Sequence, residues 1–162
     1  MPDALSLLTA DHKRVKRLLK RLEDADDAGE RTELLLKIAA EVTLHSQVEE
    51  RIFYPAYHAA AMNDEEEALF FEAEEEHRLV TEVLARAQRI NAGSPEFKGL
   101  AKVLKDLIEH HAEEEEAEMF PRAKKLMSPD QLAALGARIE ATQTAGWSKR
   151  LVPVRLGPTR LS

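Results

Sequence analysis

The sequence predicts an all-α protein, an up-down-up-down four-helix bundle with a short fifth C-terminal helix and a tail. Charged residues make up 33% of the 162 residues, aromatic residues only 5%, and there are only 6 glycines. This composition is typical of helical proteins. Four long segments also carry apolar residues at helical spacing, and short breaks separate them. A chain of this length suits one domain with a substantial core.

The first two predicted helices run from about Ala4 to Asp24 and over about residues 30–61. Asp3 precedes the first helix and is the residue type that caps helix N-termini. Apolar residues three and four positions apart mark one buried face on each helix. These stripes are Leu5, Leu8, Val15, Leu19 and Leu22 in the first helix, and Leu35, Ile38, Val42 and Ile52 in the second.

The third and fourth predicted helices cover about residues 64–91 and the segment from Pro95 to about Phe120. A Gly-Ser-Pro break at residues 93–95 separates them. Pro55 and Pro121 lack a backbone donor, so we expect each to kink or end its helix near one end of the bundle. The apolar stripes are Phe70, Ala73, Val80, Leu84 and Ala87, then Leu100, Leu104, Ile108 and Met119.

A fifth, shorter helix is predicted to begin at Ser128-Pro129-Asp130, where serine suits the N-cap and proline the first turn, and to run to about Ala141. The segment from Trp147 to Ser162 is basic and aperiodic, and we expect a flexible or loosely packed tail. The predicted division is therefore a bundle over residues 1–125, then the short helix and basic tail over 126–162. Whether the tail binds an acidic protein partner is left open.

Several classes of protein are disfavoured by composition. Cysteine is absent, which excludes disulfides, thiolate nucleophiles and cysteine-ligated clusters. The net charge of −7 argues against nucleic acid as a partner. No run of about 18 apolar residues predicts a membrane span. The first residues lack the basic-then-apolar pattern of a secretory signal, so we expect a cytoplasmic location.

One eleven-residue pattern occurs twice, at residues 45–55 and 111–121. Each copy has a histidine, two adjacent glutamates beginning four residues later, an aromatic residue and then proline. A histidine and a glutamate four residues apart point the same way from a helix. The repeat therefore offers two His–Glu pairs, His45 with Glu49 and His111 with Glu115, to a common point in the bundle.

Two further histidines, His12 and His77, fall on the buried stripes of the first and third predicted helices. The four histidines are 33, 32 and 34 residues apart. With short loops in an up-down-up-down bundle, these spacings bring all four to one level. The predicted metal ligands are therefore His12, His45, Glu49, His77, His111 and Glu115.

Six buried polar groups of this kind need compensation, because an unpaired ionised carboxylate in a core is costly. Divalent metal ions supply it. Imidazole with carboxylate suits iron or manganese, and zinc less distinctively. Two carboxylates from two helices can bridge two metals, and two histidines per metal complete the protein ligands, so the set suits a dinuclear centre.

Other residues near this level are secondary candidates. His110 adjoins His111, but the repeat selects His111. Glu74 lies three residues before His77, yet it belongs to an acidic run that we expect on a solvated face. Glu50 and Glu116 follow the predicted ligands and are expected to make supporting or surface contacts. Tyr54 and Phe120 hold equivalent positions in the repeat, as expected for packing near the bundle end.

On these residues the chain resembles the hemerythrin-like, HHE cation-binding domain proteins over residues 1 to about 125. The resemblance implies a non-haem centre of two iron ions joined by an oxo or hydroxo bridge. Glu49 and Glu115 would bridge the irons and the four histidines would be terminal ligands. The oxygen-carrying hemerythrins have a fifth histidine at the position of Ala73 and one more residue between the last histidine and carboxylate. The chain is thus more similar to the four-histidine, two-glutamate variety.

The resemblance implies a reaction with hydrogen peroxide, nitric oxide or dioxygen, as in a catalase-like or oxidative-stress role. A protein that binds, senses or stores oxygen, nitric oxide or iron without turnover is the alternative. A ferritin-like di-iron bundle is a rival fold, but only Glu74 and His77 fit its E-x-x-H motif. A metal-free helical interaction protein is a third reading. Whether Glu74 or water takes the place of the fifth histidine is left open.

Overall fold

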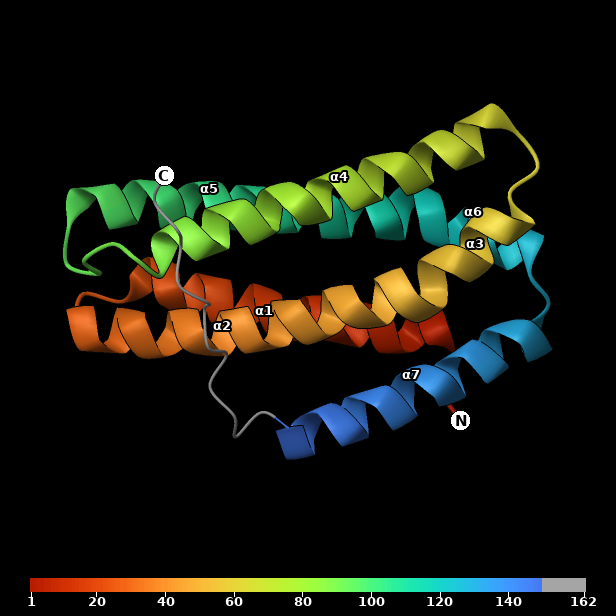
Figure 1. The fold of residues 1–162 in the computed structure, drawn as a ribbon, viewed down its shortest axis with the longest axis horizontal. Coiled ribbons are helices and arrows are strands. Elements are labelled where there is room, and N and C mark those ends of the chain that lie inside the picture. Colours follow the sequence, from red (N-terminus) through yellow and green to blue (C-terminus); the bar gives the residue numbers. More distant parts are fainter. Residues whose placement is uncertain (150–162) are drawn as a thin grey trace, which may run out of the picture.

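The computed structural model describes residues 1–149 and confirms an all-helical bundle (Figure 1). The tail was predicted to begin at Trp147, but residues 147–149 belong to the C-terminal helix, and the rest of the predicted tail, residues 150–162, lies outside the described residues. Two π-helical turns, η1 and η2, interrupt the second and fourth long helices. The elements are α1 Ala4–Asp24, α2 Ala28–Val48, η1 Glu49–Phe53, α3 Tyr54–Ala60, α4 Asp64–Ala87, α5 Pro95–Glu114, η2 Glu115–Met119, α6 Phe120–Leu126 and α7 Pro129–Lys149.

Helices α1 and α2 form one antiparallel pair and α4 and α5 the other, with α3 and α6 together at one end (Figure 1). Local sequence sets where the helices begin. The first N–H groups of a helix have no partner within it. In four of the helices a side chain caps the N-terminus by accepting a hydrogen bond from the backbone N–H of the residue three positions later. The caps are Asp3 for α1, Asp27 for α2, Asn63 for α4 and Ser94 for α5.

The two prolines of the repeat do not end their helices, and the fourth helix therefore continues beyond the predicted end at Phe120 to Leu126. In both copies a π-helical turn precedes the proline. The Tyr54 N–H donates to Glu49 O, five residues earlier, and the Phe120 N–H donates to Glu115 O. The proline then follows as the second residue of a new α-helical segment. A wider turn at this point allows the chain to pass a residue that lacks a backbone donor.

The C-terminal helix α7 is longer than the sequence suggested, since it continues past Ala141 to Lys149. It packs obliquely across α1 and α2 (Figure 1). Leu132, Leu135 and Ile139 are buried on its inner face. Ser128 accepts a hydrogen bond from the Gln131 N–H, as expected for its cap. Apolar periodicity did not predict this extension, because the last turns of the helix carry mainly polar residues.

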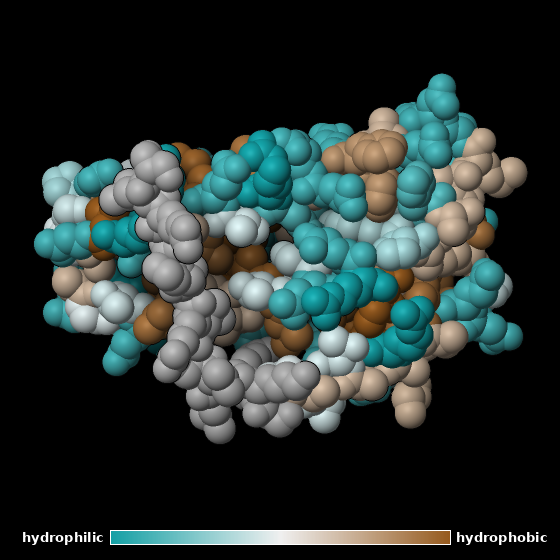
Figure 2. Space-filling view, viewed as in Figure 1, coloured by the Kyte–Doolittle hydropathy of each residue, from teal (hydrophilic) through white to brown (hydrophobic). Residues whose placement is uncertain are grey.

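Two apolar clusters fill the interior, and along each long helix the predicted histidine ligand lies between residues of one cluster and residues of the other. In α1, for example, Leu8 belongs to the cluster near α3, α6 and α7, and Val15 belongs to the other. His12 lies between them. In the space-filling view, hydrophilic side chains cover much of the outward helix surface and apolar ones show between them (Figure 2). Within residues 1–149, no helix combines the length and hydropathy that a bilayer crossing requires.

Candidate metal centre

The six side chains predicted as metal ligands come together in the interior of the bundle. They are buried, with exposed fractions between 0% for Glu49 and 9% for His12. His12 comes from α1, His45 from α2 and His77 from α4. Glu49 is the first residue of η1 and Glu115 the first of η2. Each π-helical turn of the repeat thus begins at a carboxylate of the centre, and π turns inside helices are frequent at functional sites.

The six residues form two groups of four that share both carboxylates. His12 and His45 make one group with Glu49 and Glu115, and His77 and His111 make the other with the same two glutamates. In each group, one potential ligand atom from every residue lies within 4.8 Å of the others. We call these groups the His12–His45 half and the His77–His111 half of the centre.

Each glutamate presents one oxygen to each half. Glu49 Oε1 is 2.9 Å from His45 Nε2, and Glu49 Oε2 is 2.9 Å from His77 Nε2. Glu115 Oε2 is 3.1 Å from His12 Nε2, and Glu115 Oε1 is 3.3 Å from His111 Nε2. This division of oxygens is the arrangement that two bridging carboxylates need.

Four of these buried atoms have no hydrogen-bond partner among the described residues. They are His12 Nε2, His45 Nε2, Glu49 Oε1 and Glu115 Oε2, all in the His12–His45 half. Unsatisfied buried polar atoms cost free energy, and several that converge on one point are the arrangement that a bound cation would satisfy. The donor set, imidazole nitrogen with carboxylate oxygen, fits iron, manganese or zinc. The residues present therefore fit a bound metal ion.

In the His77–His111 half, the hydroxyl of Tyr54 lies among the ligand atoms. It is 3.1 Å from Glu49 Oε2 and 2.5 Å from Glu115 Oε1, and it donates to carboxylate there. The same oxygen is 3.0 Å from His77 Nε2 and 3.3 Å from His111 Nε2. The sequence predicted only a packing role for Tyr54 near the bundle end and did not predict these contacts of its hydroxyl. Its ring packs on Phe70 and His77, and its oxygen is a further potential ligand.

A carboxylate holds the outer ring nitrogen, Nδ1, of every histidine in the centre. Such contacts orient imidazole ligands and leave Nε2 to face the metal. Two of the carboxylates are the second glutamates of the repeat, which serve histidines of other helices, as expected for supporting contacts. The four Nδ1 contacts are His12 with Glu116 at 2.9 Å, His45 with Asp11 at 3.1 Å, His77 with Glu50 at 2.9 Å and His111 with Glu76 at 3.0 Å.

Opposite charges hold the metal-free centre together. Burial alone would lower the pKa of His45, but the charge of Glu49, 2.9 Å away, and the hydrogen bond with Asp11 raise it to about 10. Burial would raise the pKa of Glu49, yet His45, His111 and His77 keep it well below its usual range. Burial, with the charges of Glu115 and Glu49, raises the pKa of Tyr54 well above its usual value. A proton therefore occupies the Nε2 atom of His45, where a metal would bind, and metal binding must release it.

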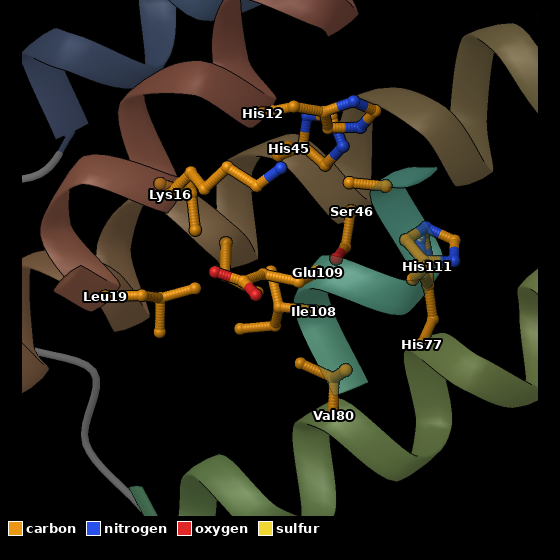
Figure 3. Close-up of a pocket in the computed structure, with 13 residues that line it drawn as sticks. His12, Lys16, Leu19, His45, Ser46, His77, Val80, Ile108, Glu109 and His111 are labelled. Carbon is orange, nitrogen blue, oxygen red and sulfur yellow. Dashed lines mark hydrogen bonds between the residues drawn. The ribbon is translucent and has the colours of Figure 1, made fainter. Parts of the chain in front are cut away.

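A cavity of about 30 Å³ borders both halves of the centre (Figure 3). Its volume suits a water-sized or diatomic molecule. The histidines form one side, and Leu19, Val80 and Ile108 lie on the other (Figure 3). Lys16 and Glu109 add charged groups to the lining, whose remaining members are Val15, Val42, Ser46 and Ala112.

The two secondary candidates lie outside both groups. Glu74 is exposed on α4. The side chain of His110 is 67% exposed and pairs with Glu76 and Glu114 on the α4–α5 surface. Sequence reasoning did not single out Asp11 and assigned Glu76 to a solvated run. Glu76 lies one residue before His77 in that run. This adjacency to a predicted ligand was the only sign in the sequence that Glu76 could lie near the centre.

Comparison with known proteins agrees with this geometry. The model of the hemerythrin HHE cation-binding domain matches residues 3–123. The uncharacterised protein Rv2633c of Mycobacterium tuberculosis is 27% identical over 141 residues, covering 86% of this chain and 84% of that protein. An uncharacterised hemerythrin-like protein of Schizosaccharomyces pombe is 24% identical over 149 residues, covering 92% and 70%.

Two further relatives differ in how much of their length is matched. A DNA nickase of Nostoc sp. is 25% identical over 138 residues, or 85% of this chain, which spans only 38% of that protein. The crystal structure of an HHE cation-binding domain-containing protein from Mycobacterium kansasii, a homologue of Rv2633c, superposes with a TM-score of 0.83 at 26% identity. That match covers 97% of this chain and 94% of the other, so it includes α7. The chain belongs to the hemerythrin family of HHE cation-binding domain proteins.

Proposed function

We propose that the protein holds two non-haem iron ions, one in each half of the centre, and that the loaded centre reacts with hydrogen peroxide, nitric oxide or dioxygen. One observation carries this proposal: two buried groups of four ligands share both carboxylates of Glu49 and Glu115. A single metal would leave one histidine pair unused. Family membership supports metal binding, and the donor set favours iron without selecting it uniquely.

The chain's own residues would bind and orient the metals. His12 and His45 would hold one ion, His77 and His111 the other, and both glutamates would bridge. The Tyr54 hydroxyl lies among the ligand atoms of the His77–His111 half. It would offer an oxygen to a metal there, where Ala73 stands at the position of the fifth histidine. When bound, the two irons would provide redox chemistry and open positions for a small ligand.

The cavity beside the histidines supports a small ligand. Its walls are apolar over Val15, Leu19 and Val80, which limits water beside the centre, and Lys16 and Glu109 bring charges of opposite sign to the lining. Such a lining suits a small neutral ligand. A reaction that consumes peroxide, with a role in oxidative or nitrosative stress, is the function these features support best.

The experiment is iron quantitation with optical and Mössbauer spectra of the aerobic protein, before and after peroxide is added. The proposal predicts two irons per chain, the spectrum of an oxo- or hydroxo-bridged pair, and evolution of dioxygen from peroxide. A long-lived reversible ligand adduct without peroxide turnover would instead identify a binding, sensing or storage protein. Protein that takes up no metal under any condition would contradict the proposal.

A further inference from the structure

The C-terminal helix reaches a predicted metal ligand through one buried carboxylate. The side-chain amide of Gln143 on α7 donates to Asp11 Oδ2 at 2.8 Å. The same oxygen lies 3.1 Å from His45 Nδ1. Gln143 lies 20 residues beyond position 123, where the match to the family model ends. A contact chain therefore runs from a segment outside the matched domain to the His12–His45 half of the centre.

Asp11 differs from the other carboxylates that hold the histidines. Its side chain is 5% exposed, whereas those of Glu76, Glu116 and Glu50 are 15%, 42% and 48% exposed. Both oxygens of Asp11 also have a further partner, because Arg14 pairs with Oδ1 and Gln143 donates to Oδ2. A buried acceptor fixed on both oxygens holds an imidazole more firmly than an exposed glutamate, which water can solvate.

The docking of α7 fixes where Gln143 lies. Gly136 packs against the backbone at the start of α1, so closely that a Cβ there would lie 2.6 Å from Pro2 O. Ile139 and Leu135 are buried about one and two turns before Gln143, respectively. Because backbone contacts and buried side chains set the position of the helix, the amide of Gln143 is presented to Asp11 by a firmly seated element.

We propose that Gln143 is a positioning residue for the metal of the His12–His45 half, which makes α7 part of the metal centre. When Nε2 of His45 binds a metal, Nδ1 carries the hydrogen and donates it to Asp11. Gln143 holds the accepting oxygen in place and so fixes the ring of His45 in its ligating orientation. This inference rests on the proposed function, since it requires a metal in that half. Supporting contacts of this kind alter metal affinity by about 10- to 100-fold.

The test uses Co²⁺ as the probe, added to the metal-free full chain, with metal release to a chelator and the visible Co²⁺ spectrum as readouts. Gln143→Met removes the donor at similar length, and Gln143→Glu places a second carboxylate opposite Asp11. Gln143→Lys keeps a donor. Thr144→Ala is the matched control, because among the described residues the Thr144 hydroxyl donates to Glu140 O within its own helix.

We expect Gln143→Met to speed the release of one of the two Co²⁺ ions by about tenfold and to change the absorption of that ion alone. Gln143→Glu has a larger effect, while Gln143→Lys and Thr144→Ala behave like the wild type. Unchanged release and spectra in both Gln143→Met and Gln143→Glu would overturn the role of Gln143. Equal acceleration of both ions would also overturn it, because that result indicates general loosening. Wild-type protein that binds fewer than two Co²⁺ ions would instead contradict the proposed dinuclear centre.

Discussion

Phe120 and Tyr54 occupy equivalent positions in the repeated motif, and each packs on a histidine in a different half of the centre. The Phe120 ring stacks on His12, with centroids 5.9 Å apart and planes 5° from parallel. The Tyr54 ring lies 5.2 Å from His77 and is tilted by 37°. Both rings thus serve as apolar walls, but only Tyr54 adds an oxygen, which faces the ligand atoms of its half.

That one oxygen makes the halves unequal in the metal-free protein. The ligand atoms of the His77–His111 half have the Tyr54 hydroxyl as a partner. The four ligand atoms of the centre that lack a hydrogen-bond partner among the described residues are all in the His12–His45 half. A metal entering the latter meets unsatisfied ligands, whereas a metal entering the former must replace or reorient a hydroxyl. We therefore expect the first metal equivalent to bind in the His12–His45 half.

The largest expected effect is the loss of both metal ions through one substitution. Glu49→Ala or Glu115→Ala should abolish binding of both metals, because each carboxylate serves both histidine pairs. Elemental analysis of the purified variants measures the loss. Glu113→Ala is the control, since that side chain is 67% exposed and lies outside the centre. Either glutamate variant retaining two metals would show that the carboxylates are not shared.

Single histidine substitutions should separate the halves. His45→Ala should lower the stoichiometry from two metals to one, with the remaining metal in the His77–His111 half. His77→Ala should leave one metal in the other half, so the two variants should differ in their metal spectra. His110→Ala, at the exposed neighbour of a ligand, should keep two metals. Identical spectra for His45→Ala and His77→Ala would argue that a single site is being measured.

The pH dependence of stability should differ between metal-free and metal-loaded protein. In the metal-free fold the pKa of His45 is raised from 6.5 to about 10. Its stabilising contribution is complete below about pH 6.5 and is lost as the pH rises towards 10. Bound metal removes this dependence, because it takes neutral imidazole. The thermal unfolding midpoint of the metal-free protein should fall as the pH rises across this range, and that of the metal-loaded protein should not. An equal decrease of the midpoint with pH in both forms would contradict the expectation.

In acid, the stabilising contribution of Glu49 changes with pH in the opposite direction. The pKa of Glu49 is held below its usual 4.5, so its contribution is present above that value and is lost as the pH falls. Protons also displace metal from both carboxylate and imidazole. Metal content after dialysis should therefore drop in acid. Full retention of both metals well below pH 4 would count against this ligand set.

The smallest change removes only the oxygen that distinguishes the halves. Tyr54→Phe should bring the metal-release rates of the two halves closer together while leaving two metals bound. The free energy of unfolding should change by about 1–3 kcal/mol, as for loss of a buried hydrogen-bond partner. Tyr57→Phe is a matched control, because the Tyr57 hydroxyl donates to Glu66 O and not to the centre. Release rates that stay as far apart as in the wild type would remove Tyr54 as the source of the inequality.

Periodicity and spacing were sufficient to predict the bundle and to bring the six candidate ligands to one level. His12 and His77 interrupt apolar stripes, and a histidine on such a stripe can only face the interior. The same method could not assign Tyr54, because an aromatic residue satisfies the apolar pattern whether or not its hydroxyl has a partner. Asp11 was missed because it adjoins His12 in sequence but serves His45 on another helix.

The end of the fourth helix and the length of α7 were also beyond the sequence pattern. A proline usually ends a helix, and nothing in the residues alone shows that a π-helical turn will carry the chain past Pro121. The last turns of α7 are polar, so their periodicity is weak. Gly136 reads as a helix-weakening residue, although its close approach to Pro2 is what seats the helix on α1.

An anomalous difference map from crystals of iron-loaded protein tests most directly whether two metal ions share the carboxylates of Glu49 and Glu115. We expect two peaks about 3.5–4 Å apart, the separation usual in two-metal sites. One should contact His12 and His45 and the other His77 and His111, with both glutamates between them. A single peak, or two peaks without a common carboxylate, would contradict this expectation.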